Sequence, residues 1–401
     1  MSAPTAPKIA IACGGTGGHL FPGLAITEQL VRRGVSVTLL ISPKDVDQQA
    51  AKKISGMEIV TLPAVGLSSG QKIAFLRGFI QSYRAARKHF RNNPPDAALA
   101  MGGFTSAPPL LAAKPFGAQI FLHESNTIPG RANRWLSRVV HQAFVGFPQA
   151  ASRLHTRNVT TTGTPVRPEF QPRAAAACRA ALGLDPARPV LLVVGGSQGA
   201  TGVNNLLVNS LPAWERQRSQ ELQFLHFTGA ADAERVRRAY AEKNLRAVVH
   251  PFFSEMELAL GAATVAVSRA GASSLAELAA MRVPSVLIPF PAATDNHQFF
   301  NARAFTDTGA AQLLEQKNAT PDLLVSLVSE LISNAAAREK MQTALAKWHA
   351  PAAAEQIAEL VLSAISRSAD CPVRVNGIAG ETRGQDSPRS DEMERTNLSA
   401  A

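Results

Sequence analysis

The sequence predicts two doubly wound α/β domains that face each other across a cleft. Residues 8–19 and 190–199, about 180 residues apart, each contain an apolar run, a glycine-rich turn and the start of a helix. An apolar run that stops at paired glycines is typical of the first strand of a parallel α/β unit, and the glycines let the backbone approach an anionic ligand. A chain of 401 residues is also too long for one ordinary core. A phosphate-bearing substrate is therefore expected between the domains.

Apolar runs that alternate with helical patterns give the first half the rhythm of a parallel sheet. A helix is expected over residues 24–33, where Gly34 ends the periodic pattern. The strands predicted after the first one are residues 35–41, 58–62, 97–101, 119–123 and 142–145.

Two prolines within residues 163–168 break this rhythm and mark the crossing to a second sheet. The predicted strands there are residues 189–194, 223–228, 247–250, 264–267 and 285–288, and the last clear helix covers about residues 353–366. The expected division is an N-terminal domain (1–165), a C-terminal domain (166–350), a helix (351–368) that could pack back on the N-terminal domain, and a disordered polar tail (369–401).

The net charge of +11 belongs to the first half of the chain. Residues 1–165 hold 18 Lys and Arg against 6 Asp and Glu, whereas residues 166–401 hold 23 against 24. A basic half suits an acidic substrate, an anionic membrane surface or nucleic acid. Solubilising charge scattered over the surface would give the same count.

The cysteines indicate neither a disulfide framework nor a zinc site, because Cys13, Cys178 and Cys371 are odd in number and far apart. A reducing compartment follows from this. Glycines interrupt the N-terminal apolar run, and no apolar span reaches the length of a membrane helix. We therefore expect a cytosolic protein that could touch a membrane.

The glycine-rich turns do not fit a dinucleotide-binding motif, because Leu20 and Ser197 stand where G-x-G-x-x-G requires glycine. A dehydrogenase is therefore the weaker interpretation. Asp45 and Asp47 have the spacing of a metal-binding D-x-D motif, although turn or cap residues would look the same.

Residues 269–277 follow an apolar strand and open a helix. Ser274 and Glu277 have the spacing of a capping box, which would account for both. A helix start with small residues, an Arg before it and a carboxylate one turn later could also hold a nucleoside diphosphate, with its N–H groups toward phosphate and its carboxylate toward ribose. Residues 295–301 gather polar groups where a loop leaves a strand, a common place for a ligand site.

Five motifs in a fixed order resemble the MurG family, glycosyltransferases that add N-acetylglucosamine to the lipid-linked muramyl-peptide precursor of bacterial peptidoglycan. They are residues 14–23, 101–108, 123–126, 195–199 and 268–277, and the match extends from residue 8 to about 366. The resemblance implies a GT-B fold, with the acceptor on the N-terminal domain and UDP-N-acetylglucosamine mainly on the C-terminal one. It implies no cofactor and no obligatory metal. The family's aromatic position that is often Tyr is Phe104 here, and Thr164 replaces a frequent Asn.

The resemblance also assigns residues to the donor. It places Thr16, Gly17 and Gly18 beside the donor sugar, Asn126 near the sugar, and Arg167 and Ser197 near the diphosphate. Phe253 matches a position whose backbone meets uracil, and Gln298 one that reads the sugar hydroxyls. The resemblance implies that the diphosphate and ribose are bound by Ala272, Ser273, Ser274, Leu275, Ala276 and Glu277.

The implied reaction displaces UDP by the 4-hydroxyl of the muramyl sugar, with inversion at the anomeric carbon. A base must take the hydroxyl proton, and His19 is the first candidate because imidazole titrates near neutrality and this one follows the glycine loop. Hydrogen bonding to the loop or to an acceptor phosphate is its alternative role, and Glu124 or His123 is the alternative base or its orienting partner. Helix N-termini, Arg167 and Arg269 could stabilise the leaving diphosphate.

An acid-free stretch over residues 59–95 interleaves basic and apolar residues. Phe75, Phe79, Arg84 and Arg87 are expected on a surface that meets anionic headgroups, which would place the protein peripherally on the cytoplasmic face of the plasma membrane. A buried helix with a solvated basic face is the alternative. No aromatic platform for nucleic acid is visible.

Other functions remain open at this point. The same fold could serve another UDP-sugar transferase or a UDP-sugar epimerase, and less well a nicotinamide-linked dehydrogenase or a sugar-nucleotide sensor. The expected partners are UDP-N-acetylglucosamine, undecaprenyl-pyrophosphoryl-muramyl-pentapeptide and the anionic membrane surface, with no nucleic acid.

Overall fold

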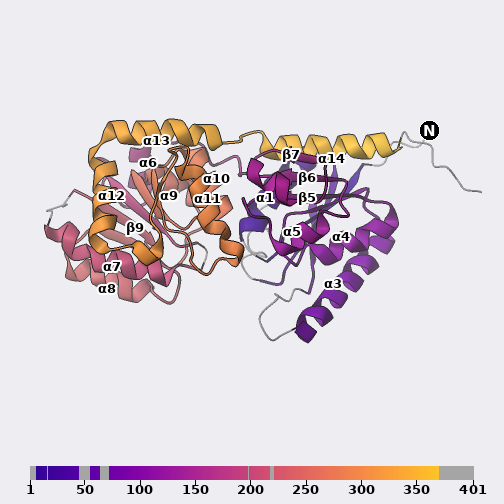
Figure 1. The fold of residues 1–401 in the computed structure, drawn as a ribbon, viewed down its shortest axis with the longest axis horizontal. Coiled ribbons are helices and arrows are strands. Elements are labelled where there is room, and N and C mark those ends of the chain that lie inside the picture. Colours follow the sequence, from indigo (N-terminus) through magenta and orange to yellow (C-terminus); the bar gives the residue numbers. More distant parts are fainter. Residues whose placement is uncertain are drawn as a thin grey trace, which may run out of the picture.

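Two parallel β-sheets with helices on both faces make up the protein in the computed structural model (Figure 1). The structure describes residues 6–15, 17–44, 55–63, 72–196, 198–216 and 221–369. The two expected doubly wound domains are confirmed. The Asp45 and Asp47 motif and the tail beyond residue 369 lie outside the described residues.

The N-terminal sheet has seven strands in the order β3-β2-β1-β4-β5-β6-β7, all paired in parallel. The first six match the predicted apolar runs to within a residue or two, and β7 was not predicted. The strands are β1 (Lys8–Ala12), β2 (Ser36–Ile41), β3 (Met57–Thr61), β4 (Ala97–Ala100), β5 (Gln119–Glu124), β6 (Gln142–Val145) and β7 (Val159–Thr161).

The first helix, α1, spans Gly17–Arg32 and therefore begins seven residues before the expected residue 24. It contains Pro22. Leu20, Ile26 and Leu30 of α1 are fully buried against the sheet. The other helical segments of this half are α3 (Lys72–Asn92), α4 (Ala107–Ala113), α5 (Arg131–Leu136) and the 3-10 turns η1 (Lys114–Phe116) and η2 (Pro148–Arg153).

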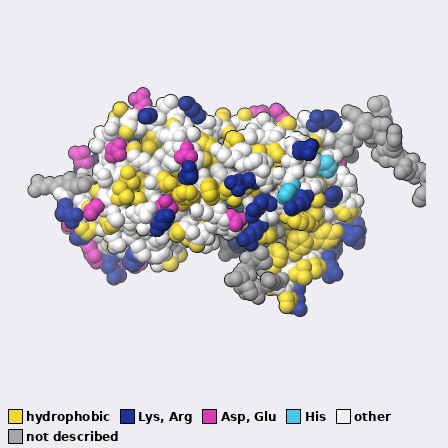
Figure 2. Space-filling model, in the orientation of Figure 1, with side chains coloured by type: hydrophobic (Ala, Val, Ile, Leu, Met, Phe, Trp, Pro, Cys, Tyr) yellow, Lys and Arg dark blue, Asp and Glu magenta, His cyan; other side chains and the backbone are white. Residues whose placement is uncertain are grey.

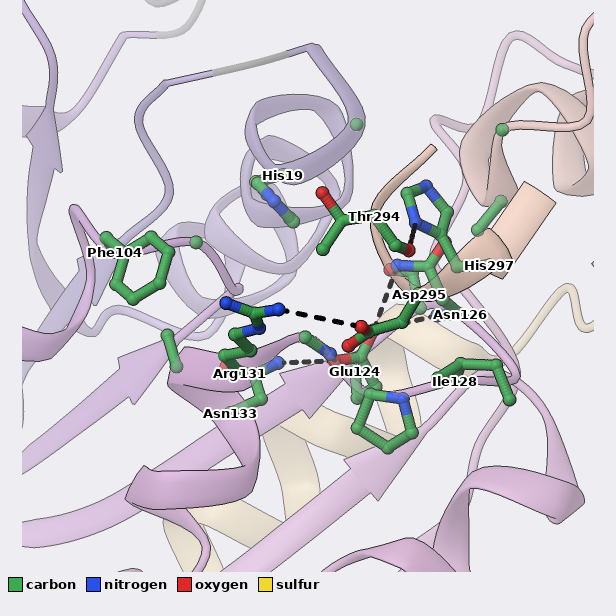
Figure 3. Close-up of a pocket in the computed structure, with 18 of the residues that line it drawn as sticks. His19, Phe104, Glu124, Asn126, Ile128, Arg131, Asn133, Thr294, Asp295 and His297 are labelled. Atoms are coloured by element: carbon green, nitrogen blue, oxygen red, sulfur yellow. Dashed lines mark hydrogen bonds and ion pairs between the residues drawn. The ribbon is translucent and has the colours of Figure 1, made fainter. Parts of the chain in front are cut away.

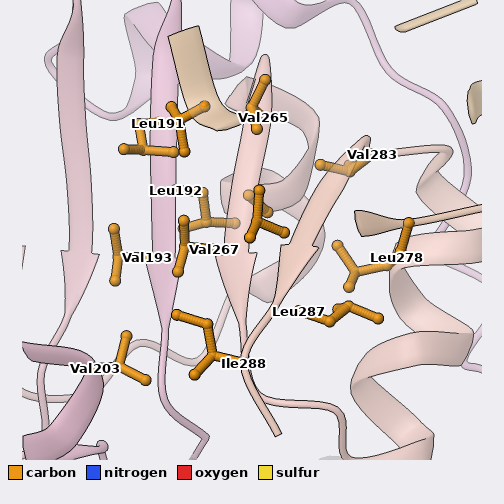
Figure 4. Packing of buried hydrophobic residues seen from close by; sticks show 14 of the residues in the cluster. Leu191, Leu192, Val193, Val203, Val265, Val267, Leu278, Val283, Leu287 and Ile288 are labelled. Atoms are coloured by element: carbon orange, nitrogen blue, oxygen red, sulfur yellow. The ribbon is translucent and has the colours of Figure 1, made fainter. Parts of the chain in front are cut away.

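The C-terminal sheet has six parallel strands in the order β10-β9-β8-β11-β12-β13. Its strands are β8 (Val190–Val194), β9 (Gln223–Phe227), β10 (Ala247–His250), β11 (Val265–Ser268), β12 (Ser285–Leu287) and the unpredicted β13 (Gln312–Leu313). Residues such as Leu192 on β8 and Val267 on β11 are buried among neighbouring aliphatic side chains (Figure 4). Such continuous apolar strands are what a sheet covered on both faces requires.

Nine α-helices and two 3-10 turns of the described chain follow in this half and beyond it. They are α6 (Ala175–Ala181), α7 (Thr201–Arg216), α8 (Ala233–Glu242), α9 (Met256–Ala262), α10 (Ala272–Met281), η3 (Thr294–Asn296), α11 (His297–Thr306), η4 (Gln316–Asn318), α12 (Pro321–Ser333), α13 (Ala335–Trp348) and α14 (Ala353–Ala369).

The chain crosses between the two halves twice, and the crossings touch. Gly163 in the first crossing has a φ of +80°, and a Cβ placed on it would come within 2.3 Å of the Cβ of Ala350 in the second. After the second crossing, α14 lies across the N-terminal half (Figure 1), with Ile357 and Val361 buried in that half's core. The close approach leaves no room for a side chain at position 163.

Helix α3 carries apolar side chains on its outer face, where they lie beside basic ones (Figure 2). Ile73, Leu76 and Ile80 are 71%, 58% and 39% exposed. Phe75 and Phe79, which were expected on this surface, are instead half-buried, because Phe75 packs edge-on against Phe104 of the loop after β4. The exposed apolar surface therefore consists of the aliphatic residues.

Candidate active site

A cavity of about 530 Å³ lies between the carboxyl edges of the two sheets (Figure 3). The N-terminal half contributes residues that follow β1, β4 and β5, and the C-terminal half contributes the start of α10 and the turn before α11. The strand order reverses between β1 and β4 in one sheet and between β8 and β11 in the other. Open α/β sheets bind ligands at such switch points, and the volume suits a small-molecule ligand.

His19 lies in the first turn of α1 and lines the cavity. Its ring rests against a turn after β4 that contains Gly102 and Gly103, both with positive φ. A Cβ on Gly102 would come within 2.7 Å of the imidazole Cε1. The two glycines therefore make room for the ring, and they fix it at the cavity wall.

Glu124, at the end of β5, is buried, and its carboxylate accepts four hydrogen bonds. Oε1 accepts from the backbone N–H of Asn126 (2.9 Å) and from its side-chain amide (3.0 Å). Oε2 accepts from the backbone N–H of Gly130 (3.0 Å) and from the side-chain amide of Asn133 (2.9 Å). Four donors occupy the lone-pair directions of a carboxylate. Glu124 therefore orders the loop after β5.

Asn301 of α11 joins this loop to the C-terminal half. Its Oδ1 accepts from the backbone N–H and the hydroxyl of Thr127, both at 2.9 Å. Its Nδ2 donates to Asn126 Oδ1 (3.0 Å) and to the Ala270 carbonyl (3.2 Å). Asn301 is fully buried, and its amide makes every hydrogen bond that it can. The polar cluster at residues 295–301 thus holds the two halves together through Asn126, which lines the cavity, and through Thr127 behind it.

A second bond between the halves depends on a proline. Pro22 has no N–H, so the carbonyl of Gly18, one turn earlier in α1, receives no helical hydrogen bond from it. That carbonyl instead accepts from the hydroxyl of Ser273 in α10, at 3.0 Å. The starts of α1 and α10 are therefore linked directly.

Comparisons with known proteins agree with this geometry. Residues 9–145 match the glycosyltransferase family 28 N-terminal domain, and residues 190–357 match the family 28 C-terminal domain. A protein of Anaeromyxobacter dehalogenans is 34% identical over 90% of this chain and 94% of its own length. Its name is "UDP-N-acetylglucosamine--N-acetylmuramyl-(pentapeptide) pyrophosphoryl-undecaprenol N-acetylglucosamine transferase". The chain belongs to the MurG family.

Further relatives support this assignment. A protein of Chlorobaculum parvum with the same name is 34% identical over 90% of this chain and the whole of its own length. The crystal structure of MurG from Acinetobacter baumannii superposes with a TM-score of 0.67 at 27% identity, and the match covers 90% of this chain and all of that one. The predicted family and its GT-B fold are confirmed.

The start of α10, which the MurG resemblance assigns to the diphosphate and ribose, lies at the cavity with Ala272 and Ser273. The capping-box interpretation of Ser274 and Glu277 is wrong, because the helix begins earlier, with Gly271 as its N-cap and no side-chain cap. Leu275 is a core residue, and Ala276 is partly buried. Ser274 and Glu277 therefore lie inside the helix.

Glu277 is a half-buried carboxyl one turn into α10. Burial raises its pKa to about 7; the charge of Arg167 opposes this shift, and Glu257 adds to it. Arg167 itself forms a 2.7 Å ion pair with Glu169 and lies 5.0 Å above the ring of Phe21. Arg167 and Glu277, which the MurG resemblance assigns to the donor, are thus near each other, outside the residues that line the cavity.

Other residues that the MurG resemblance assigns to the donor lie apart from the cavity lining. Phe253 stacks on Phe227 at 5.1 Å, beside the ends of β9 and β10. Gln298 accepts a hydrogen bond from the Phe290 backbone at 3.0 Å. Gly17 begins α1 but does not line the cavity. Thr16 and Ser197 lie outside the described residues.

Arg269 and His123 have protein partners. The Arg269 guanidinium donates to the carbonyls of Ile288 and Pro289 and to Gln316, and it is absent from the cavity lining. His123 is fully buried, which lowers its pKa to about 4. Its Nε2 donates to the Gly163 carbonyl at 3.1 Å, and its Nδ1 faces the Ser125 hydroxyl. These contacts tie β5 to the first crossing.

No group of three His, Cys, Asp or Glu side chains with metal-binding geometry occurs in the part of the chain that the structure describes. Sequence reasoning missed Asn133 and the bond from Ser273 to α1, and it identified Asn301 only as part of the polar segment 295–301. The partners of Asn301 and Ser273 are distant in sequence, so no local pattern could have indicated those contacts. Asn133 bonds to Glu124 nine residues earlier, across a loop whose course the sequence does not indicate.

Proposed function

We propose that this protein transfers N-acetylglucosamine from UDP-N-acetylglucosamine to the 4-hydroxyl of the muramyl sugar of undecaprenyl-pyrophosphoryl-muramyl-pentapeptide. This converts lipid I to lipid II in peptidoglycan synthesis, the activity for which its curated relatives are named. The observation that carries the proposal is the cavity at the switch points of both sheets, where His19 faces the start of α10.

The proposed step is a single displacement with inversion. The acceptor oxygen forms a bond to the anomeric carbon while the bond from that carbon to the diphosphate breaks, and UDP leaves with the electron pair. His19 takes the hydroxyl proton, since it follows the first glycine loop and its ring is held at the cavity wall by the turn that contains Gly102 and Gly103. The N-terminal N–H groups of α10, near Ala272 and Ser273, stabilise the negative charge that develops on the diphosphate.

Glu124 is proposed as a positioning residue and not as the base. Its four hydrogen bonds fix Asn126 and the loop up to Asn133, and taking a proton would disrupt them. The Asn126 amide is shared between Glu124 and Asn301, so its contact with the donor sugar requires one of these bonds to be exchanged.

The donor site extends along the C-terminal half from the cavity. Glu277 is proposed to bind the ribose, Phe253 to contact uracil through its backbone, Gln298 to read the sugar hydroxyls, and Arg167 to attract the diphosphate. Thr16, Gly17 and Gly18 are proposed to lie beside the donor sugar, and Ser197 is proposed to lie near the diphosphate. The N-terminal domain (1–165) would then present the acceptor, and the C-terminal domain (166–350) the donor.

Helix α3 is proposed to contact the anionic cytoplasmic surface of the membrane in which the acceptor is anchored. Ile73, Leu76 and Ile80 would enter the headgroup region, and Arg84 and Arg87 would meet lipid phosphates. No acidic residue interrupts α3. None of the helices in the described part of the chain combines the length and apolar character that spanning a bilayer requires. A peripheral location follows from this proposal.

A UDP-release assay with purified protein tests the proposed reaction. We expect UDP to form from UDP-N-acetylglucosamine only when lipid-linked muramyl-pentapeptide is added, and the product to carry a new β-linked N-acetylglucosamine. Release without an acceptor, or conversion of the donor to another UDP-sugar, would exclude the proposal in favour of a hydrolase or an epimerase.

A further inference from the structure

The Arg131 side chain projects into the cavity from the start of α5 (Figure 3). It is 65% exposed, and its nearest acidic group is Asp295, with Nη2 3.9 Å from Oδ1. Among the described residues the guanidinium donates no hydrogen bond. A cation therefore faces the cavity with its donors available to a ligand.

Asp295 of the C-terminal half lies beside Arg131, and Arg134 of α5 binds its carboxylate. The Arg134 Nη2 lies 2.6 Å from Asp295 Oδ2, a short charge-assisted hydrogen bond. Asp295 and the next residue, Asn296, have φ values of 52° and 54°, in the left-handed region. Asp and Asn tolerate this conformation better than most residues. The turn therefore presents a carboxylate to Arg131 without Arg131 itself binding it closely.

Glu124, the other carboxylate at the cavity, does not compete with a ligand for the Arg131 guanidinium. Glu124 already accepts four hydrogen bonds, all from the loop after β5. The Arg131 and Asp295 pair is exposed, and exposed ion pairs contribute little to stability. An incoming anion could therefore replace Asp295 at the guanidinium at small cost.

The acceptor in the proposed reaction carries anions of the kind that a guanidinium binds. Its name specifies a pyrophosphoryl group, and its pentapeptide ends in a carboxylate. Arginine binds both groups through two parallel hydrogen bonds. We propose that Arg131 binds an anionic group of the acceptor inside the cavity, and that Asp295 occupies this position when the acceptor is absent. This assignment rests on the proposed function.

The test compares two variants for which opposite effects are expected. Arg131→Ala should raise the KM for lipid-linked muramyl-pentapeptide about ten- to a hundredfold, the range expected for losing a charge-assisted contact, and leave the donor KM unchanged. Asp295→Asn should lower the acceptor KM by about two- to fivefold, because it removes a weak competitor and asparagine suits the left-handed turn. Arg131→Lys keeps the charge and should recover part of the loss.

Arg138→Ala is the matched control, since it removes the same charge from an exposed site outside the cavity and should behave as the parent does. Two acceptor analogues separate the possible anions. If the Arg131→Ala defect persists on an acceptor without its peptide, Arg131 binds the diphosphate; if the defect disappears there, and also with a C-terminal amide, it binds the carboxylate.

An unchanged acceptor KM in Arg131→Ala on every acceptor, or an increase in Asp295→Asn equal to that in Arg131→Ala, would overturn the assignment. Both readings require a parent protein that releases UDP with the lipid-linked acceptor. A parent that releases none would contradict the proposed function instead, so the two failures are distinguishable.

Discussion

Replacing Asn301 by Ala tests whether the two halves must be held together for turnover. The side chain makes four buried hydrogen bonds, to Asn126, Ala270 and twice to Thr127. The bond to Ala270 lies within the C-terminal half, so three bonds join the halves; at about 0.5–1.5 kcal/mol net for each, the closed arrangement loses about 1.5–4.5 kcal/mol. If the halves separate, Asn126 and Thr127 can form hydrogen bonds to water instead. We therefore expect the substitution to favour an open arrangement of the halves over the closed one.

A loss of about 1.5 kcal/mol corresponds to roughly a tenfold shift, so kcat/KM in the UDP-release assay should fall by at least about that factor. Small-angle scattering should report a larger radius of gyration, and chemical unfolding of each half should change less. Thr127→Val removes one of the four bonds and should give a smaller defect. Asn318→Ala, an exposed asparagine in the same half, is the control. A folded Asn301→Ala protein with kcat/KM within twofold of the parent would refute the argument.

Three further outcomes are expected. Because burial raises the Glu277 pKa to about 7, its ionised form becomes available only near and above that pH, so calorimetry should show UDP-N-acetylglucosamine binding strengthen from about pH 6 to pH 8. Glu277→Gln should bind more weakly and lose this rise, and a parent-like titration would exclude the ribose contact. His19→Ala should lower kcat roughly 10²-fold or more with little change in donor KM, whereas a defect confined to acceptor KM would make His19 an acceptor ligand. Changing Ile73, Leu76 and Ile80 together to Ser should weaken binding to anionic vesicles by about 10²-fold or more while activity on a soluble acceptor persists; parent-like vesicle binding would move the membrane contact to another face.

The sheets were predictable because buried parallel strands are continuous apolar runs, and such runs are visible in the sequence. Strands β7 (Val-Thr-Thr) and β13 (Gln-Leu) were missed because neither forms an apolar run, whereas the equally short β12 continues into the apolar Ile288. The start of α1 was missed because glycines and Pro22 read as a loop, although tertiary contacts make them helical. Ser274 and Glu277 matched a capping box by spacing alone, and only the backbone shows that Gly271 precedes the helix.

The candidate site was predictable where it follows a strand, as His19 and Glu124 do. The connections between its two halves were not, because each of them joins residues far apart in the chain. Asn301 lies 174 residues from Thr127, and Asp295 lies 161 residues from Arg134. Phe75 illustrates the same limit on the surface, since its burial depends on Phe104 in another loop.

Pro22 in α1 lowers the stability of its helix but allows a hydrogen bond between the two halves. An alanine at position 22 would restore the missing N–H and strengthen the helix by up to about 3 kcal/mol. The new N–H would also compete with the Ser273 hydroxyl for the Gly18 carbonyl. A screen for heat resistance would therefore favour Pro22→Ala, and a screen for turnover would reject it. The residue that weakens the helix is the one that frees an acceptor for the opposite domain.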